Sequence, residues 1–311
     1  MTSSNPVTDR ARDAAQPSLW SRVARARWAY LFIAPFFVSF AVFGLYPLLF
    51  SVYLSFAEWK GFGPIELVGF KNYVKLFQDR VFWQSVVNSV IIFGLHVPLM
   101  VLLSLLLATV LNSPRVRGFG IFRTIIFIPY ITNMVAAGFA FRLLLEQENG
   151  LVNIMLTTAG FPAVPWLESV WGARVSLTLL ILWHYLGYNM VIMLAGLQTI
   201  PKEVHDAARV DGANAWQSFF LITVPLMRPV ILFVLVLSTM GSFDLFTEIF
   251  VLTGGGPINA TLTPILSIYN QAFGNFRFGY ASAMSYVYFL IIIALTLVQI
   301  RYVNRPQGAR S

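Results

Sequence analysis

One short stretch of the chain combines aromatic and polar side chains in a way that suits a polyhydroxylated ligand. Its members are Trp183, His184, Tyr185, Tyr188 and Asn189. Flat rings offer surfaces for C–H groups, while phenol and amide groups offer hydrogen bonds. A mostly apolar pocket with a few placed polar groups is the general pattern of small-molecule sites. The alternative interpretation is that these rings fill the interior of a helix bundle, with their hydroxyls bonded to neighbouring backbone.

The remaining polar residues give little indication of a catalytic site or a metal site. The chain has no cysteine, and its three histidines are too scattered to suggest a metal site. Asp244 and Glu248 lie about one helical turn apart beside an apolar run; a functional role within a membrane and a hydrated helix end explain them equally well. No Gly-x-x-x-x-Gly-Lys-[Ser/Thr] phosphate loop occurs. We therefore expect no enzyme activity, cofactor or metal.

A polar segment, Ile200–Ala213, interrupts the apolar sequence with features of a short helix. Pro201 suits its first position, and Glu203 complements the positive helix end. Asp206 offers an acceptor for an arginine on a partner. Gly212 permits a left-handed residue and hence a sharp turn. The face predicted to enter a partner's cleft carries Val204, Ala207, Ala208 and Asp211.

The surrounding sequence consists of membrane-spanning helices. Hydrophobic residues make up 58% of the 311 residues and charged residues only 11%, whereas about 25% charge is usual in soluble domains. Apolar runs long enough to cross about 30 Å of hydrocarbon occur six times, at Trp28–Phe56, Ser85–Leu111, Phe119–Leu145, Val175–Leu197, Ser218–Met240 and Ala281–Tyr302. The fold class is therefore all-α, a polytopic membrane protein with six transmembrane helices in contact with lipid.

The distribution of basic residues predicts the orientation. With both termini in the cytosol, 14 of the 21 lysines and arginines fall in cytosolic segments, as the positive-inside rule requires. This explains the formal net charge of +8 without nucleic acid. We expect a cytosolic tail at 1–27, a transmembrane domain at 28–303 with a cytosolic loop at about 199–228, and a second tail at 304–311. The polar helix then faces the cytosol.

Several motifs resemble one family over nearly the whole chain. Asp206-Ala207-Ala208, Gly212, Ile222 and Pro225 resemble the "EAA" loop of binding-protein-dependent ABC importer permeases, although Asp206 replaces the usual glutamate and Val224 the usual leucine. Further matches favour the carbohydrate-uptake branch, and within it the first permease of each pair, the maltose, glycerol-phosphate and oligosaccharide type. They are Gly69–Tyr73, Ile128–Tyr130, Ala195–Gln198, Val251–Pro257 and Phe278–Ser282.

The resemblance implies roles for individual residues. Contact with the ATPase is implied for Glu203, Asp206, Ala207, Ala208, Gly212, Ile222 and Pro225. Tyr130, Tyr188 and Ser238 keep the residue type of sugar-contact positions, and Ser242 is a polar replacement at another. With Tyr185 and Asn189 they form the expected substrate pathway. Met134, Ile181 and Leu245 are apolar where the maltose-type pocket is not, which indicates a different sugar or a different pose.

The resemblance also implies partners. A second permease, a cytosolic dimer of ATP-binding subunits and an extracytoplasmic solute-binding protein would complete an ATP-driven sugar importer in a prokaryotic cell membrane. The alternative is a stand-alone secondary transporter of a small polar solute, which would explain the hydrophobicity without an ATPase. It predicts internal repeats and acidic residues at mid-membrane; no repeat is visible, and such acids are absent outside the Asp244 region.

Overall fold

The computed structural model describes residues 27–112 and 118–303, so most of the two expected tails lies outside it. The chain divides into two compact units, Met1–Tyr53 and Leu54–Ser311. The first contains α2 (Arg27–Phe40), a π-helical turn η1 (Ala41–Leu45) and most of α3 (Tyr46–Ser55). These elements form an apolar stretch, Tyr30–Ser55, long enough to cross a membrane.

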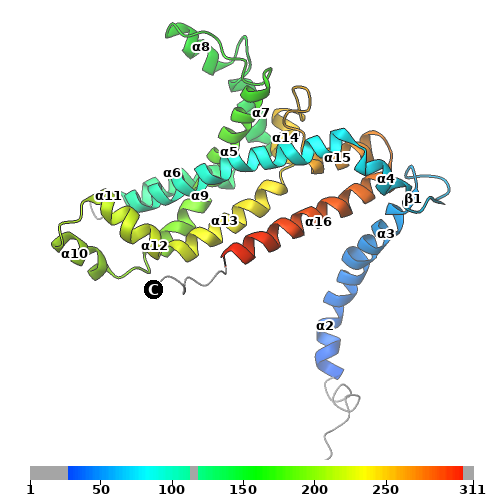
Figure 1. Ribbon diagram of the computed structural model, residues 1–311, viewed down its shortest axis with the longest axis horizontal. Helices are drawn as coiled ribbons and strands as arrows, with labels where there is room; N and C mark the ends of the chain where they lie inside the picture. Colours follow the sequence, from blue (N-terminus) through cyan, green and yellow to red (C-terminus); the bar gives the residue numbers. More distant parts are fainter. Residues whose placement is uncertain (1–26, 113–117, 304–311) are drawn as a thin grey trace, which may run out of the picture. The chain divides into compact units, whose positions relative to one another are not determined.

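The second unit is a helix bundle with three more continuous apolar helices: α5 (Arg80–Leu111), α9 (Val170–Leu197) and α16 (Phe278–Val303). The side chain of Asp79 begins α5 by accepting hydrogen bonds from the amides of Val81 and Phe82, and Ser169 caps α9 in the same way. α13 (Arg228–Phe243) packs against α5, α9 and α16 (Figure 1). A core of leucine, isoleucine and methionine side chains fills the contact between α5 and α9.

The two other expected spans, Phe119–Leu145 and Ser218–Met240, are each divided by a bend. α6 (Phe119–Ile131) meets α7 (Met134–Leu144) at 96°, and the segment ending in α12 (Val224–Leu226) meets α13 at 71°. If each bent pair is one span, the described residues hold six spans. Asn133 begins α7 by capping the amides of Val135 and Ala136, which makes the first bend a new helix start rather than a kink.

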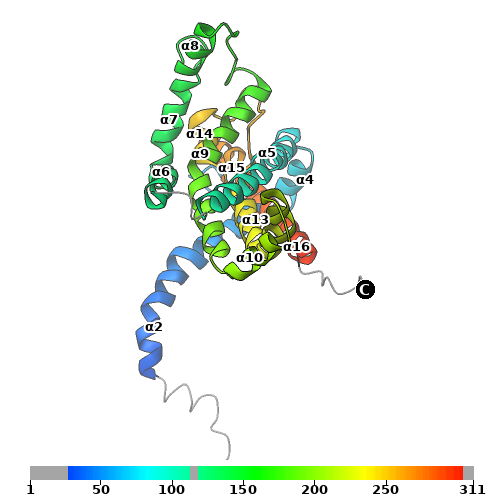
Figure 2. The same cartoon turned by 90° about the vertical axis from the view of Figure 1, so that its left-hand side faces the viewer.

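Short elements connect the spans. Two strands, β1 (Ala57–Glu58) and β2 (Glu66–Leu67), pair antiparallel. Between the longer helices lie α4 (Lys71–Phe77), α8 (Leu151–Thr158), α10 (Lys202–Val210), α11 (Ala215–Ser218), η2 (Phe219–Thr223), α14 (Thr247–Leu252), α15 (Pro264–Tyr269) and η3 (Asn270–Gly274). Within the second unit, α10 lies at the end opposite to α4 and β1 (Figure 1), and Figure 2 looks onto that end.

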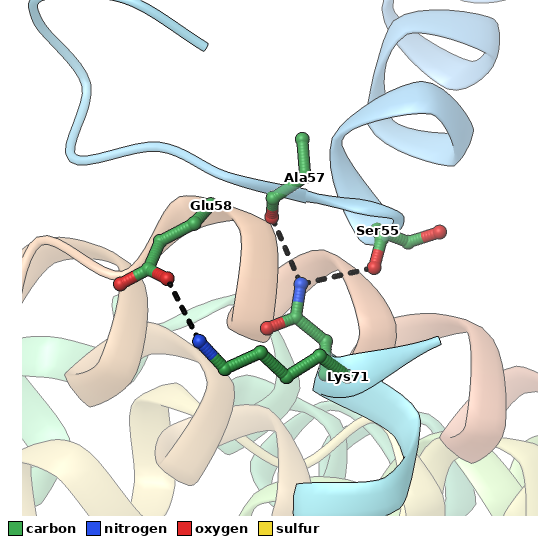
Figure 3. A network of polar contacts seen from close by, with 5 residues as sticks. Ser55, Ala57, Glu58 and Lys71 are labelled. Carbon is green, nitrogen blue, oxygen red and sulfur yellow. Dashed lines mark hydrogen bonds and ion pairs between the residues drawn. The ribbon is translucent and has the colours of Figure 1, made fainter. Parts of the chain in front are cut away.

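Polar contacts attach α4 to the strand that follows α3. The amide of Asn72 donates to the carbonyls of Ser55 (3.0 Å) and Ala57 (2.9 Å), and Lys71 pairs with Glu58 at 3.6 Å (Figure 3). Asn72 and Leu76 are the buried residues of α4, whereas the apolar side chains of Val74 and Phe77 remain exposed.

The glycine-rich loop after α14 is attached to two spans. Asn88 on α5 donates to the carbonyls of Asn259 (2.6 Å) and Leu262 (3.0 Å). Arg174 on α9 donates to Asn88 (3.1 Å) and to the carbonyl of Ala260 (3.1 Å). Because these contacts satisfy backbone groups of an irregular segment, they fix its conformation. Ile258 at its tip is 86% exposed.

Gly187 allows α9 and α6 to approach closely. A Cβ at this position would collide with the backbone carbonyl of Ile126. We expect Gly187→Val to destabilise the protein by at least about 3 kcal/mol, because overpacking against a backbone cannot be relieved by a rotamer change. Gly94→Val on α5 is the matched control, since nothing lies within 4 Å of its Cβ position. Size-exclusion chromatography after heating measures the difference; equal stability of the two variants would contradict the packing argument.

Candidate functional site

A cavity of about 280 Å³ opens between α5, α6, α9, α13 and the segment leading to α14. This volume is near the lower end of the range for ligand pockets, about 300 Å³. Its lining residues are His96, Met100, Tyr130, Ile181, Tyr185, Tyr188, Asn189, Leu237, Ser238, Gly241, Ser242, Asp244, Leu245 and Glu248. They come from parts of the sequence up to about 150 residues apart, so only the folded bundle assembles this site.

All six residues expected in the substrate pathway line this cavity: Tyr130, Tyr185, Tyr188, Asn189, Ser238 and Ser242. The rings of Tyr130 and Tyr188 stack with centroids 4.6 Å apart and planes 18° from parallel. Gly187 makes this possible, because it lets the helix carrying Tyr130 approach the helix carrying Tyr188. The stacked pair presents an aromatic surface of the kind on which sugar C–H groups pack.

Hydroxyl groups with unused hydrogen-bonding capacity face the same space. The Oγ atoms of Ser238 and Ser242 are buried and have no hydrogen-bond partner among the described residues. Leaving a buried hydroxyl unpaired costs about 1–3 kcal/mol, and both serines line the cavity. They are therefore available to a polar ligand. Asn189, in contrast, already donates to the carbonyl of Tyr185 at 3.0 Å.

Two carboxylates complete the polar lining. Glu248 is 5% exposed and accepts a hydrogen bond of 2.9 Å from the hydroxyl of Tyr185. Asp244 follows the last residue of α13 and is exposed. The interpretation of both acids as hydrated groups at a helix end therefore fails for Glu248, which is buried. Its contact with a span far away in sequence ties the start of α14 to α9.

Several residues near the aromatic stretch do not line the cavity. Trp183 is 40% exposed and packs against Phe141. His184 is buried, and its Nδ1 has no hydrogen-bond partner among the described residues. Met134 packs in the core, whereas Ile181 and Leu245 do line the cavity.

His96 lines this cavity although no sequence pattern predicts it there. This histidine lies on α5, where it is buried. Its Nδ1 is 2.7 Å from the carbonyl oxygen of Ile92. The only indication in the sequence is that a polar residue lies inside an apolar span, which is weak evidence of function. Nothing in the sequence points to the lining residues Met100, Leu237 and Gly241.

The second candidate site is the helix α10. The face that it exposes is not the face predicted to enter a partner's cleft. Ala208 is 7% exposed and faces the protein, and Val204 beside it is half-buried. The exposed face instead carries residues spaced three and four apart, Glu203, Asp206, Ala207 and Val210. Pro201 precedes the helix as its cap rather than forming its first residue. Asp206 pairs with Arg209 at 3.3 Å in an exposed contact.

The end of α10 has the hydrogen bonds of a Schellman motif. Gly212 has φ of 82°, its amide donates to Arg209, and the amide of Ala213 donates to Ala208. The predicted sharp turn is therefore present. Of the other two residues expected to contact an ATPase, Ile222 lies half-buried in η2 and Pro225 lies exposed in α12. A capping box between Asn214 and Gln217 starts α11 directly after the turn.

Comparison with known families identifies this architecture. Residues 67–305 match the family described as "Binding-protein-dependent transport system inner membrane component". The chain belongs to this family. It is therefore a multi-pass membrane protein and the membrane component of a transport system rather than an enzyme.

The relatives of this permease include sugar transport proteins. It is 40% identical over 275 residues to the lactose transport system permease protein LacF of Rhizobium radiobacter, covering 87% of this chain and 92% of LacF. It is 35% identical over 299 residues to the arabinooligosaccharides transport system permease protein AraP of Bacillus subtilis (strain 168), covering 95% of each chain. The fold matches a chain of a bacterial ABC transporter that imports the acidic polysaccharide alginate, with a TM-score of 0.81, 23% identity and coverage of 94% and 100%.

Proposed function

We propose that this chain is the membrane-spanning permease subunit of an ATP-driven sugar importer. The observation that carries this proposal is the cavity, in which a stacked tyrosine pair lies beside two serine hydroxyls that have no hydrogen-bond partner in the described part of the chain. Aromatic faces and hydrogen-bonding groups together are what a sugar requires. The names of LacF and AraP, which specify lactose and arabino-oligosaccharides, support the same substrate class.

The geometry of α10 supports coupling to a separate ATPase. Its exposed face combines two acids, a small alanine and the 87% exposed Val210. This face suits a cleft on a partner, where Asp206 would accept hydrogen bonds from an arginine. Because the sequence contains no phosphate loop, the ATP is hydrolysed by another polypeptide. A dimer of ATP-binding subunits would contact α10 here and the equivalent helix of a second permease.

The arrangement of the second unit supports an orientation with both termini in the cytosol. α10 lies at one end, whereas β1, α4 and the start of α16 lie at the other (Figure 1). With the basic residues on the α10 side, this end faces the cytosol. The opposite end then receives the solute-binding protein, and the exposed tip at Ile258 in the Thr253–Ala260 loop is a suitable contact.

Transport requires the cavity to open alternately to each side. ATP binding would close the ATPase dimer and move α10 as a rigid body, because its Schellman turn and the capping box of α11 join it firmly to the following helices. Rotation of the bundle about the interface with the second permease then exposes the cavity outward or inward. The chain itself contributes binding groups and no covalent chemistry.

Affinity purification of this chain in mild detergent from its native cell tests the proposal. The expected result is recovery of a second six-span permease and an ATPase carrying a phosphate-binding loop, identified by mass spectrometry. Recovery of the chain alone, or only as a homo-oligomer, under conditions that keep known importers intact would overturn it. That result would favour a stand-alone secondary transporter.

A further inference from the structure

The cavity is lined by two acidic side chains, Asp244 and Glu248, and, among the described residues, by no lysine or arginine. The nitrogen Nδ1 of His96 lies 2.7 Å from a backbone carbonyl, to which it can only donate. Acids concentrated in a cleft with apolar walls produce a field that acts throughout the cleft.

The two acids belong to the cavity wall itself. Glu248 is the second residue of the six-residue helix α14, and its carboxylate takes part in backbone hydrogen bonds at the start of that helix, with Phe246 and with Glu248 itself. The hydroxyl of Tyr185 on α9 donates to the same carboxylate, and both partners line the cavity. Tyr185 thus holds the carboxylate of Glu248 beside the aromatic surface.

Ser242 supplies an independent indication that a ligand occupies the space next to these acids. It is 2% exposed, lines the cavity, and its hydroxyl has no hydrogen-bond partner among residues 27–112 and 118–303. It lies on the last turn of α13, and both Ser242 and Asp244 line the same cavity of about 280 Å³. A ligand that satisfies this hydroxyl therefore shares that space with the carboxylate of Asp244.

We propose that Asp244 and Glu248 make this pathway selective for uncharged sugars and exclude sugars that carry a carboxylate, phosphate or sulfonate. This inference rests on the proposed function and names its substrate class. An uncharged sugar can donate hydroxyl hydrogens to the two acids, whereas an anion meets like charge and finds no guanidinium or ammonium partner among the described residues that line the cavity. Unpaired like charge is a general means of rejecting a wrong ligand.

The absence of cysteine makes the charge of the cavity directly measurable. Ser242→Cys introduces one thiol into this chain within the purified native complex. Two methanethiosulfonate reagents of similar size are applied, one carrying trimethylammonium and one carrying sulfonate, and labelling of this chain is followed by mass spectrometry. The labelling rate of the cationic reagent is divided by that of the anionic reagent. This rate ratio is compared with the same ratio measured for the free thiol 2-mercaptoethanol in the same buffer.

We expect the rate ratio at Ser242→Cys to exceed that of the free thiol by about tenfold or more, because two carboxylates attract one reagent and repel the other. Adding Asp244→Asn and Glu248→Gln should return the ratio to within about twofold of the free thiol. Glu168→Gln is the matched control, because Glu168 is exposed and does not line the cavity; it should leave the ratio unchanged.

Three results would overturn the inference. They are a ratio no higher than that of the free thiol, a ratio that survives both neutralising substitutions, and failure of both reagents to reach the thiol. Labelling requires no transport, so its outcome is separate from the subunits recovered in the purification. A complete importer with an uncharged cavity would leave the proposed function standing and remove the selectivity for uncharged sugars.

Discussion

Replacing Asp206 with lysine should abolish sugar uptake while leaving the protein inserted in the membrane. Asp206 lies on the exposed face of α10, and its side chain is 68% exposed. Its contact with Arg209 is a surface ion pair, which contributes about 0–1 kcal/mol, so folding is little affected. At the proposed interface with an ATPase, the reversed charge would repel the arginine that we expect Asp206 to bind on the partner. Loss of such a contact costs about 2–5 kcal/mol, which corresponds to at least about a thirtyfold weaker association.

The measurement compares uptake and subunit recovery in cells that lack the native chain. The Asp206→Lys variant should reach wild-type membrane levels but recover little ATPase subunit on purification. Arg209→Gln is the matched control, since it removes the same intrachain ion pair without changing the acid. It should lower uptake by no more than about twofold. Normal uptake by Asp206→Lys would show that α10 does not couple to an ATPase through this residue.

The structure changes which variants on α10 are informative. Helical spacing alone groups Val204, Ala207, Ala208 and Asp211 on one face, and two alanines on a face suggest a close contact with a partner. The spacing is right, but the sequence does not say which side the following helices cover. In the fold Ala208 is buried and Ala207 is exposed. Enlarging Ala208 therefore tests packing within the chain, whereas enlarging Ala207 tests the interface.

Bends and long-range contacts are the other features that hydropathy could not predict. The apolar run across Thr132 and Asn133 has the length and composition of one span, although Asn133 is a good helix cap. A hydropathy average over about 19 residues does not detect that local signal. The Gly212 turn was predictable because its cause is local. His96 joins the cavity only because α5 packs along α9, and no local pattern records that contact.

The substrate cavity could be anticipated in its parts but not in its arrangement. Resemblance to a family indicated Tyr130, Tyr188, Ser238 and Ser242, and the aromatic and polar stretch on α9 indicated Tyr185 and Asn189 as well. The fold brings all six to one space. The stacking of Tyr130 on Tyr188 and the contact between Tyr185 and Glu248 depend on how the bent α6 and the start of α14 meet α9. The stacking of the two tyrosines depends on the close backbone approach at Gly187. In the sequence, that approach is indicated only by a glycine within an apolar helix.

Filling the cavity should impair transport without disturbing the ATPase contact. Ser238→Phe adds a ring to a space of about 280 Å³, and Tyr188→Leu removes one side of the stacked pair. We expect uptake to fall at least about thirtyfold in Ser238→Phe, because the ring would occupy the volume through which we propose that the sugar passes. In Tyr188→Leu we expect about a tenfold fall, since an aromatic contact contributes about 0.5–1.5 kcal/mol beyond its buried area.

Matched variants separate occlusion from loss of a hydrogen bond. Ser238→Ala removes the hydroxyl but leaves the cavity open, so uptake should fall only about fivefold, the effect of one net hydrogen bond of about 1 kcal/mol. All three variants should recover the second permease and the ATPase in wild-type proportions, because the cavity does not include α10. A variant that does not recover these subunits has a folding defect, and a fall in its uptake is then attributed to that defect rather than to the cavity. Unchanged uptake in both Ser238→Phe and Tyr188→Leu, with the subunits present, would place the sugar pathway elsewhere in the bundle.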